Sequence, residues 1–137
     1  QSEVMVNMAD QRNGQTATFA GGYAQVGYFL TGEHRPYDRK AGAIDRVKPI
    51  ENFFRVPTDE GIAHGSGAWE VAFRVSYIDL TDANVRSGQM TDVTTGVNWY
   101  LNPYTKLVFN WVHAFVDDPA LGMNNTDLFG LRAQVDF

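Results

Sequence analysis

The feature that most constrains this chain is a two-residue alternation of apolar and polar side chains that recurs in long segments. It is strictest at 129–137, where every second residue is apolar and the residues between are small, polar or charged. The same alternation is found at 69–77, 93–101 and 107–115. Because successive side chains of a β-strand point to opposite faces, these segments predict an all-β fold. No segment has a convincing helical periodicity.

Two weaker segments near the start raise the predicted number of strands to six. Residues 4–8 alternate, and 20–31 are strand-like but rich in glycine. Between them, Asn13-Gly14 is a strong hairpin signal. The order of strands along the chain therefore begins with a hairpin.

The connections between the later strands differ in composition. Residues 102–105 predict a tight turn, whereas 81–89 and 117–125 predict longer loops. Residues 32–67 hold three of the five prolines, dense charge and little periodicity. We expect this segment to be one long ordered or partly ordered connection.

Alternation alone fits both a soluble β-sandwich and a membrane barrel. The expected strands are about 10–12 residues long, against about 5–6 in globular sheets, and about 9–11 tilted residues cross a bilayer. The last strand ends flush at an aromatic residue, and further aromatic residues lie near strand ends, as in the girdles of membrane barrels. These aromatic residues are Trp69, Trp99, Tyr100, Tyr104, Phe115 and Phe137.

Composition excludes several other classes of protein. The chain has no cysteine, which excludes disulfide frameworks and thiolate sites. It has no apolar run of roughly 18 residues, and its start lacks the pattern of a signal peptide. The histidines are too scattered for a metal site, and no nucleophile or nucleotide motif is present. We therefore expect no enzyme, no cofactor, no metal and no nucleic-acid partner.

The net charge of -5 hides a basic segment. Residues 34–55 contain six basic and three acidic residues, for a net charge of +3, and the remaining residues carry a net charge of -8. Strand parity places three further cations on the polar face. Arginine binds phosphate through paired, charge-assisted hydrogen bonds. The candidate pore-lining or anion-binding residues are therefore Arg74, Lys106, Arg132, Arg35, Arg39, Lys40, Arg46, Lys48 and Arg55.

The same cations have a structural interpretation. Those on the strands could pair with neighbours such as Glu70 or Asp136, and those of the long connection could pair with its own carboxylates. Because the charges of that segment alternate in sign, this interpretation stands beside the anion-binding one.

Several motifs resemble those of a known family. They are Tyr28-Phe29-Leu30-Thr31-Gly32-Glu33-His34-Arg35-Pro36-Tyr37-Asp38-Arg39, Gly42-Ala43, Arg46-Val47-Lys48-Pro49, Gly67-Ala68-Trp69-Glu70, Tyr77-Ile78-Asp79-Leu80, Gly96-Val97-Asn98-Trp99-Tyr100-Leu101-Asn102-Pro103 and Gly130-Leu131-Arg132-Ala133-Gln134-Val135-Asp136-Phe137. Together they resemble the phosphate-selective porin O and P family, over most of residues 19–137.

The resemblance implies an antiparallel transmembrane β-barrel in the outer membrane of a Gram-negative-type bacterium, with a homotrimer as the assembly. Its water-filled channel would let anions, phosphate or polyphosphate, diffuse passively. About sixteen strands enclose such a channel, so residues 1–137 are expected to be the C-terminal six strands of one barrel domain. The other strands would come from a longer chain or from other chains.

The resemblance also implies that the C-terminus is periplasmic. Counting strands back from it, the turn at 102–105 faces the periplasm, and the connection at 32–67 lies on the periplasmic side or folds into the lumen. Three alternatives remain open: a structural or anchoring barrel with a plugged lumen, a non-selective general diffusion porin, and a soluble β-sandwich.

Overall fold

The computed structural model describes residues 1–12, 14–58, 61–82, 85–120 and 122–137, and at 55–58, 63 and 86 it describes the backbone alone. The elements in this part of the chain are β-strands. It includes no helix with the length and hydropathy needed to cross a bilayer.

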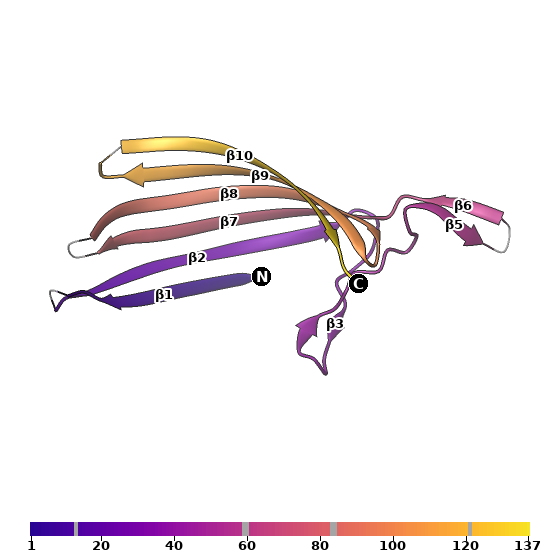
Figure 1. The fold of residues 1–137 in the computed structure, drawn as a ribbon, viewed down its shortest axis with the longest axis horizontal. Coiled ribbons are helices and arrows are strands. Elements are labelled where there is room, and N and C mark those ends of the chain that lie inside the picture. Colours follow the sequence, from indigo (N-terminus) through magenta and orange to yellow (C-terminus); the bar gives the residue numbers. More distant parts are fainter. Residues whose placement is uncertain (13, 59–60, 83–84, 121) are drawn as a thin grey trace. The chain divides into compact units, whose positions relative to one another are not determined.

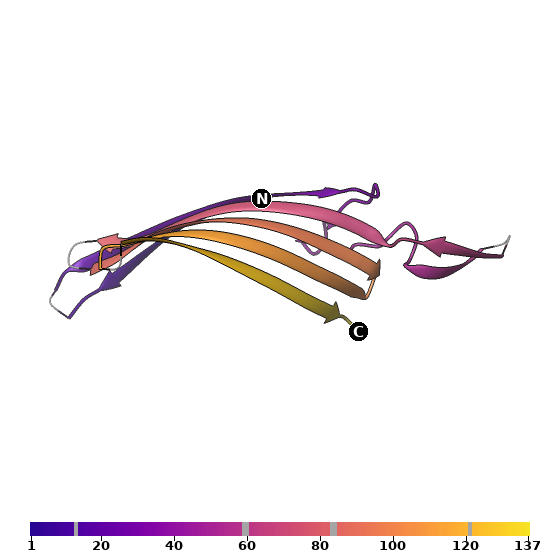
Figure 2. The same cartoon turned by 90° about the horizontal axis from the view of Figure 1, so that it is seen from above.

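Six long strands form one antiparallel sheet in the order β1-β2-β7-β8-β9-β10, which can be followed in Figures 1 and 2. Five of them have 14 to 18 residues and β1 has 9, so the prediction of six long strands is confirmed. β1 and β10 are the two edges of this sheet. The strands are β1 (Ser2–Asp10), β2 (Thr16–Phe29), β7 (Ala68–Asp82), β8 (Val85–Asn102), β9 (Thr105–Asp118) and β10 (Gly122–Val135).

The loops at the ends opposite the 102–105 turn are shorter than expected. β7 continues to Asp82 and β8 begins at Val85, so most of the predicted 81–89 loop is strand. Likewise β9 ends at Asp118 and β10 begins at Gly122, within the predicted 117–125 loop. The expected contrast between long loops and a short turn is therefore wrong. Turn-forming residues can also extend a strand when a neighbouring strand supplies hydrogen-bond partners.

The long connection between β2 and β7 contains two short hairpins. The first pairs β3 (Tyr37–Asp38) with β4 (Ala43–Ile44), and the second pairs β5 (Phe54–Thr58) with β6 (Gly61–Gly65). In the first hairpin, the Asp38 carboxylate accepts the N–H of Lys40 at 2.7 Å, which is an Asx-type turn. The β3–β4 turn thus rests on turn chemistry, which strand periodicity does not reveal.

The alternation seen in the sequence separates two faces of the sheet. Trp69 and Trp99 stack on each other with ring centroids 4.8 Å apart, while their neighbours Glu70 and Tyr100 hydrogen-bond on the other face. We call these the apolar face and the polar face. Side chains of the apolar face leave a large hydrophobic surface exposed, as expected of a lipid-facing wall. Exposed members include Phe73, Val75, Tyr77, Phe109, Trp111, Phe115, Phe129 and Leu131.

By their contacts the described residues form two compact units. The first comprises Gln1–Val26, Phe73–Thr95 and Trp111–Phe129, and the second comprises Gly27–Ala72, Gly96–Asn110 and Gly130–Phe137. The buried hydrophobic cluster of the second unit contains Val47, Ala68 and Tyr100, with Phe29 packed against it. This cluster brings the long connection against the strands of the same unit.

Candidate functional site

The second unit is organised around the carboxylate of Glu70, whose side chain is 1% exposed. The Arg35 guanidinium donates to both carboxylate oxygens, with contacts of 2.8 to 3.0 Å. Asn98 Nδ2 and the Tyr100 hydroxyl each donate to Oε2 at 3.0 Å. A buried carboxylate is stable only when it is paired and hydrogen-bonded, and Glu70 meets both conditions.

A glycine of β2 makes room for this carboxylate. A Cβ atom added to Gly27 would lie 2.6 Å from Glu70 Oε1, which is closer than van der Waals contact allows. Gly27 therefore lets the β2 backbone approach the ion pair. The glycines that weakened the strand prediction at 20–31 thus include one with a packing role.

The Arg35–Glu70 pair holds residues 33–50, which we call the strap, against the polar face. Burial lowers the pKa of Arg35, but the hydrogen bonds and the charge of Glu70 outweigh burial, so the pKa of Arg35 is raised. Arg35 therefore stays charged, and its side chain remains 46% exposed beside the ion pair.

The two ends of the strap are joined by Glu33. Its carboxylate accepts the N–H of Ile50 at 3.1 Å and a hydrogen bond from the Thr31 hydroxyl. Burial raises the pKa of Glu33, but these hydrogen bonds outweigh it, so the pKa is lowered. Thr31 also accepts the N–H of Trp69 at 3.0 Å. The strap is thus fixed to the start of β7 as well as to Glu70.

A small cavity opens between the strap and the 103–104 connection. Its volume is about 190 Å³, below the roughly 300–1,000 Å³ of sites that hold drug-sized ligands. Three of the predicted anion-binding cations, Arg35, Arg46 and Lys106, line it. The residues lining the cavity are Arg35, Ile44, Asp45, Arg46, Val47, Tyr100, Asn102, Pro103, Tyr104, Thr105, Lys106 and Asp136.

Aromatic rings support two of the three cations. The Arg46 guanidinium carbon lies 4.5 Å from the centroid of the Tyr104 ring, and Lys106 Nζ lies 5.6 Å from that of Tyr100. Such cation–π contacts orient a cation without neutralising it. Glu70 neutralises Arg35, so Arg46 and Lys106 are the lining cations best placed to attract an anion. Asp45 and Asp136 also line the cavity and limit its positive charge.

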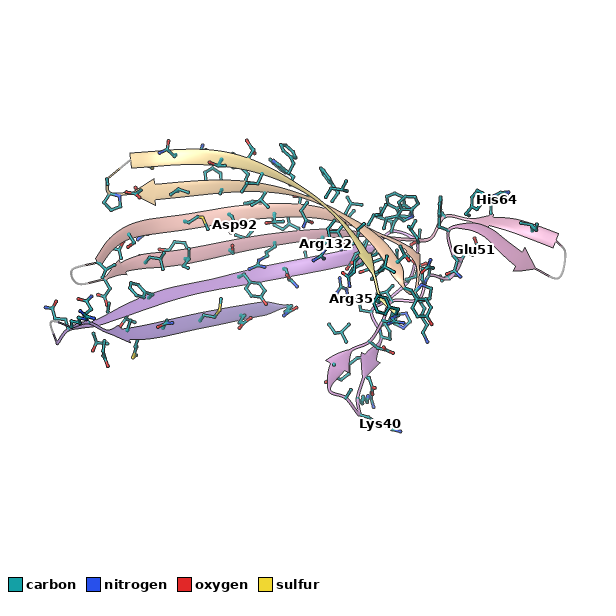
Figure 3. The ribbon with its side chains drawn as sticks, in the orientation of Figure 1. Arg35, Lys40, Glu51, His64, Asp92 and Arg132 are labelled. Atoms are coloured by element: carbon teal, nitrogen blue, oxygen red, sulfur yellow. The ribbon has the colours of Figure 1, made fainter. Side chains whose placement is uncertain are left out.

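Three other candidates in the long connection do not line this cavity. Arg39, Lys40 and Lys48 are exposed. Lys40 lies at the tip of the β3–β4 hairpin (Figure 3). The side chain of Arg55, in β5, lies outside the part that the structure describes.

The remaining two candidates lie on long strands. In the first unit, Arg74 places its guanidinium carbon 4.1 Å from the centroid of the Tyr23 ring, whose hydroxyl donates to Glu3. Arg132 is exposed on β10 in the second unit. Neither lines the cavity.

The sequence did not predict which residues pair with Glu70. The structural interpretation paired Glu70 with cations on the strands, but its ion-pair partner is Arg35 of the strap. It also placed Tyr100 in an aromatic girdle, whereas Tyr100 is buried with its hydroxyl on Glu70. The available signal was parity, because Asn98 and Tyr100 fall on the polar face of their strand.

Comparison with known proteins gives consistent matches. The family model described as phosphate-selective porin O and P matches residues 1–137. Porin O of Pseudomonas aeruginosa is 36% identical over 106 residues, which are 71% of this chain and 22% of that protein. An uncharacterized protein of Caulobacter vibrioides is 31% identical over 143 residues, covering 99% of this chain and 27% of that protein.

The chain spans about a quarter of the length of these curated relatives. The family match covers the long strands, the strap and the residues around Glu70 alike. The chain therefore belongs to the phosphate-selective porin O and P family, a family of non-enzymatic outer-membrane porins.

Proposed function

We propose that this chain is part of the wall of a barrel that lets anions, with inorganic phosphate as the main class, diffuse passively across the outer membrane. Further strands would pair with the edges at β1 and β10 and close the barrel, and three copies would form the assembly. The six long antiparallel strands and the family membership support this proposal.

The observation that carries the anion assignment is the cavity lined by Arg35, Arg46 and Lys106. Cations that line a constriction lower the energy of a permeating anion and repel cations. Arginine binds phosphate through a planar pair of donors, and lysine adds a compact charge. Because Arg46 and Lys106 each rest on a tyrosine ring, both cations are oriented before an anion arrives.

The test is single-channel recording on the complete gene product in planar bilayers. We expect the reversal potential in a KCl gradient to show anion preference and phosphate to reduce the chloride current. A hydrogen bond to a charged group contributes about 1.5–3 kcal/mol. Arg46→Gln or Lys106→Gln should therefore raise the phosphate concentration needed for half inhibition by about tenfold or more.

Lys40→Gln is the matched control, because Lys40 is an exposed cation of the same connection that does not line the cavity. Cation preference in the unmodified channel would contradict the proposal. Anion preference without any effect of phosphate would reduce it to a non-selective porin.

A second candidate is a structural barrel whose lumen the strap obstructs. It is favoured by the anchoring of the strap through the buried Arg35–Glu70 pair. Removing the β3–β4 hairpin should then raise conductance sharply. Unchanged conductance would argue against obstruction.

A further inference from the structure

A connected group of aromatic and apolar side chains lies where β5 and β6 meet the start of β7. Phe53 packs edge-on against Trp99 with centroids 4.7 Å apart, and Trp99 stacks on Trp69 at 4.8 Å. On the other side, Phe54 lies 6.1 Å from both Phe53 and His64. We name this group, together with the exposed Ile62, which lies two residues before His64 on β6, the aromatic shelf. Its members are Phe53, Phe54, Ile62, His64, Trp69 and Trp99.

The shelf continues the apolar face of the sheet. Trp69 is the second residue of β7, and Trp99 lies three residues before the end of β8. Both belong to the parity that carries the exposed apolar side chains, opposite Glu70 and Tyr100. The N–H of Phe53 donates to the carbonyl of Leu101 at 2.7 Å, so the chain joins the shelf at the end of β8.

The polar edges of the shelf are satisfied internally. The indole nitrogens of Trp69 and Trp99 both donate to the carbonyl of Ser66, at 3.2 and 2.8 Å. Their rings thus need no water at the N–H; the two rings stack on each other, and Trp99 also contacts Phe53. Tryptophan is enriched at membrane–water interfaces because one edge is polar and the ring is apolar.

The outer part of the shelf is exposed in a way that is unfavourable in water. Phe54 is 58% exposed and Ile62 is 62% exposed. Phe54 also has a φ of 81°, in the left-handed region that non-glycine residues avoid. A disfavoured backbone next to exposed apolar side chains often marks a binding surface.

We propose that the aromatic shelf docks on the phospholipid interface at this end of the strands, which the expected orientation makes the periplasmic leaflet. The β5–β6 hairpin then lies along the membrane surface as an anchor outside the barrel wall. The bilayer is the occupant because the shelf is continuous with a face that family membership places against lipid. This anchoring is independent of which ion the channel passes.

The test places an environment-sensitive fluorophore at Ile62→Cys in the complete gene product, with any cysteine outside this chain replaced. The labelled protein is reconstituted into phosphatidylethanolamine and phosphatidylglycerol vesicles that contain nitroxide lipids. We expect emission at shorter wavelength than from Lys40→Cys, an exposed position on the other hairpin. We also expect stronger quenching by nitroxides near the headgroup than by nitroxides at the bilayer centre.

Two outcomes would overturn the proposal. Emission typical of water, without quenching, would show that the hairpin stands free of the membrane. A shift to shorter wavelength without quenching by lipid nitroxides would show that protein, such as a second copy of the chain, covers the shelf.

A second variant tests whether the shelf itself holds the hairpin. Phe53→Ser should reduce the lipid quenching at position 62, whereas Tyr37→Ser, which removes an exposed aromatic ring from the β3–β4 hairpin, should not. Equal quenching in the Phe53→Ser variant and the parent would contradict the proposal. Retained channel conductance shows that each variant is folded.

Discussion

Removing either partner of the Arg35–Glu70 pair should release the strap, but to different extents. In Arg35→Ala the Glu70 carboxylate, which is 1% exposed in the parent, loses its only counter-ion among the described contacts. In Glu70→Gln the guanidinium left behind is already 46% exposed and can regain water. Because the group left behind is more deeply buried in Arg35→Ala, this variant should release the strap more than Glu70→Gln does.

The magnitudes can be set from the contacts. Removing one partner of a buried ion pair costs about 3–5 kcal/mol. Because Asn98 and Tyr100 still donate to Glu70, we expect the lower end for Arg35→Ala, about 3 kcal/mol, or about a hundredfold more opening of the strap. For Glu70→Gln we expect about 1–2 kcal/mol, or about tenfold more opening.

Hydrogen–deuterium exchange of the complete gene product in detergent measures this opening directly. The amides to follow are those of Asp45, which donates to the Pro36 carbonyl, and Ile50, which donates to Glu33. The double variant should lose less protection than the sum of the single variants, because both act on one interaction. Arg39→Ala removes an exposed arginine of the strap and should leave the protection of these two amides unchanged.

Additive effects in the double variant would refute this reasoning. So would a loss of protection in Glu70→Gln as large as that in Arg35→Ala.

Two other perturbations probe the same region. Gly27→Ala should displace the Glu70 carboxylate and destabilise the docked strap by about 1–3 kcal/mol. Gly130→Ala is the control and should be neutral, because no atom lies within 4 Å of the added Cβ. Equal hydrogen–deuterium exchange of the strap amides in the two variants would contradict the close approach of the Gly27 backbone to Glu70. Because the pKa of Glu33 is lowered in the folded protein, its carboxylate stabilises the strap above its ordinary pKa, and this stabilisation is lost as the pH falls through the lowered pKa. At neutral pH the Ile50 amide should therefore be better protected from exchange in the parent than in Glu33→Gln, and in acid its protection should be the same in both. A difference in protection that persists in acid would argue against Glu33 as the cause.

The strands were predictable because their signal is local. The alternation at 69–77, 93–101 and 129–137 indicates which side chains share a face of the sheet, and it can be read within each strand separately. The loop at 81–89 was predicted poorly for the converse reason. Its Thr, Asp and Asn residues favour turns in isolation, but pairing with a neighbouring strand extends β7 and β8 through most of it.

The candidate site was predictable only in part. The net charge of +3 over residues 34–55 directed attention to the segment that contains Arg35 and Arg46. It did not distinguish Arg35, which Glu70 neutralises, from Arg46, which rests on the Tyr104 ring; both line the cavity. That distinction depends on contacts between residues 30 to 60 positions apart in the chain.

The amino-acid sequence alone therefore determined the all-β class, the six strands, their two faces and the family, since each of these is recorded in residue order and short-range pattern. Only the tertiary structure decided that Glu70 is the centre of the strap's attachment, that Tyr100 belongs to it, and that three of the eight candidate cations with described side chains share one cavity. The physical reason is that a buried carboxylate must find its donors in space. The residues that supply them here, Arg35, Asn98 and Tyr100, come from two segments on either side of Glu70 in the chain.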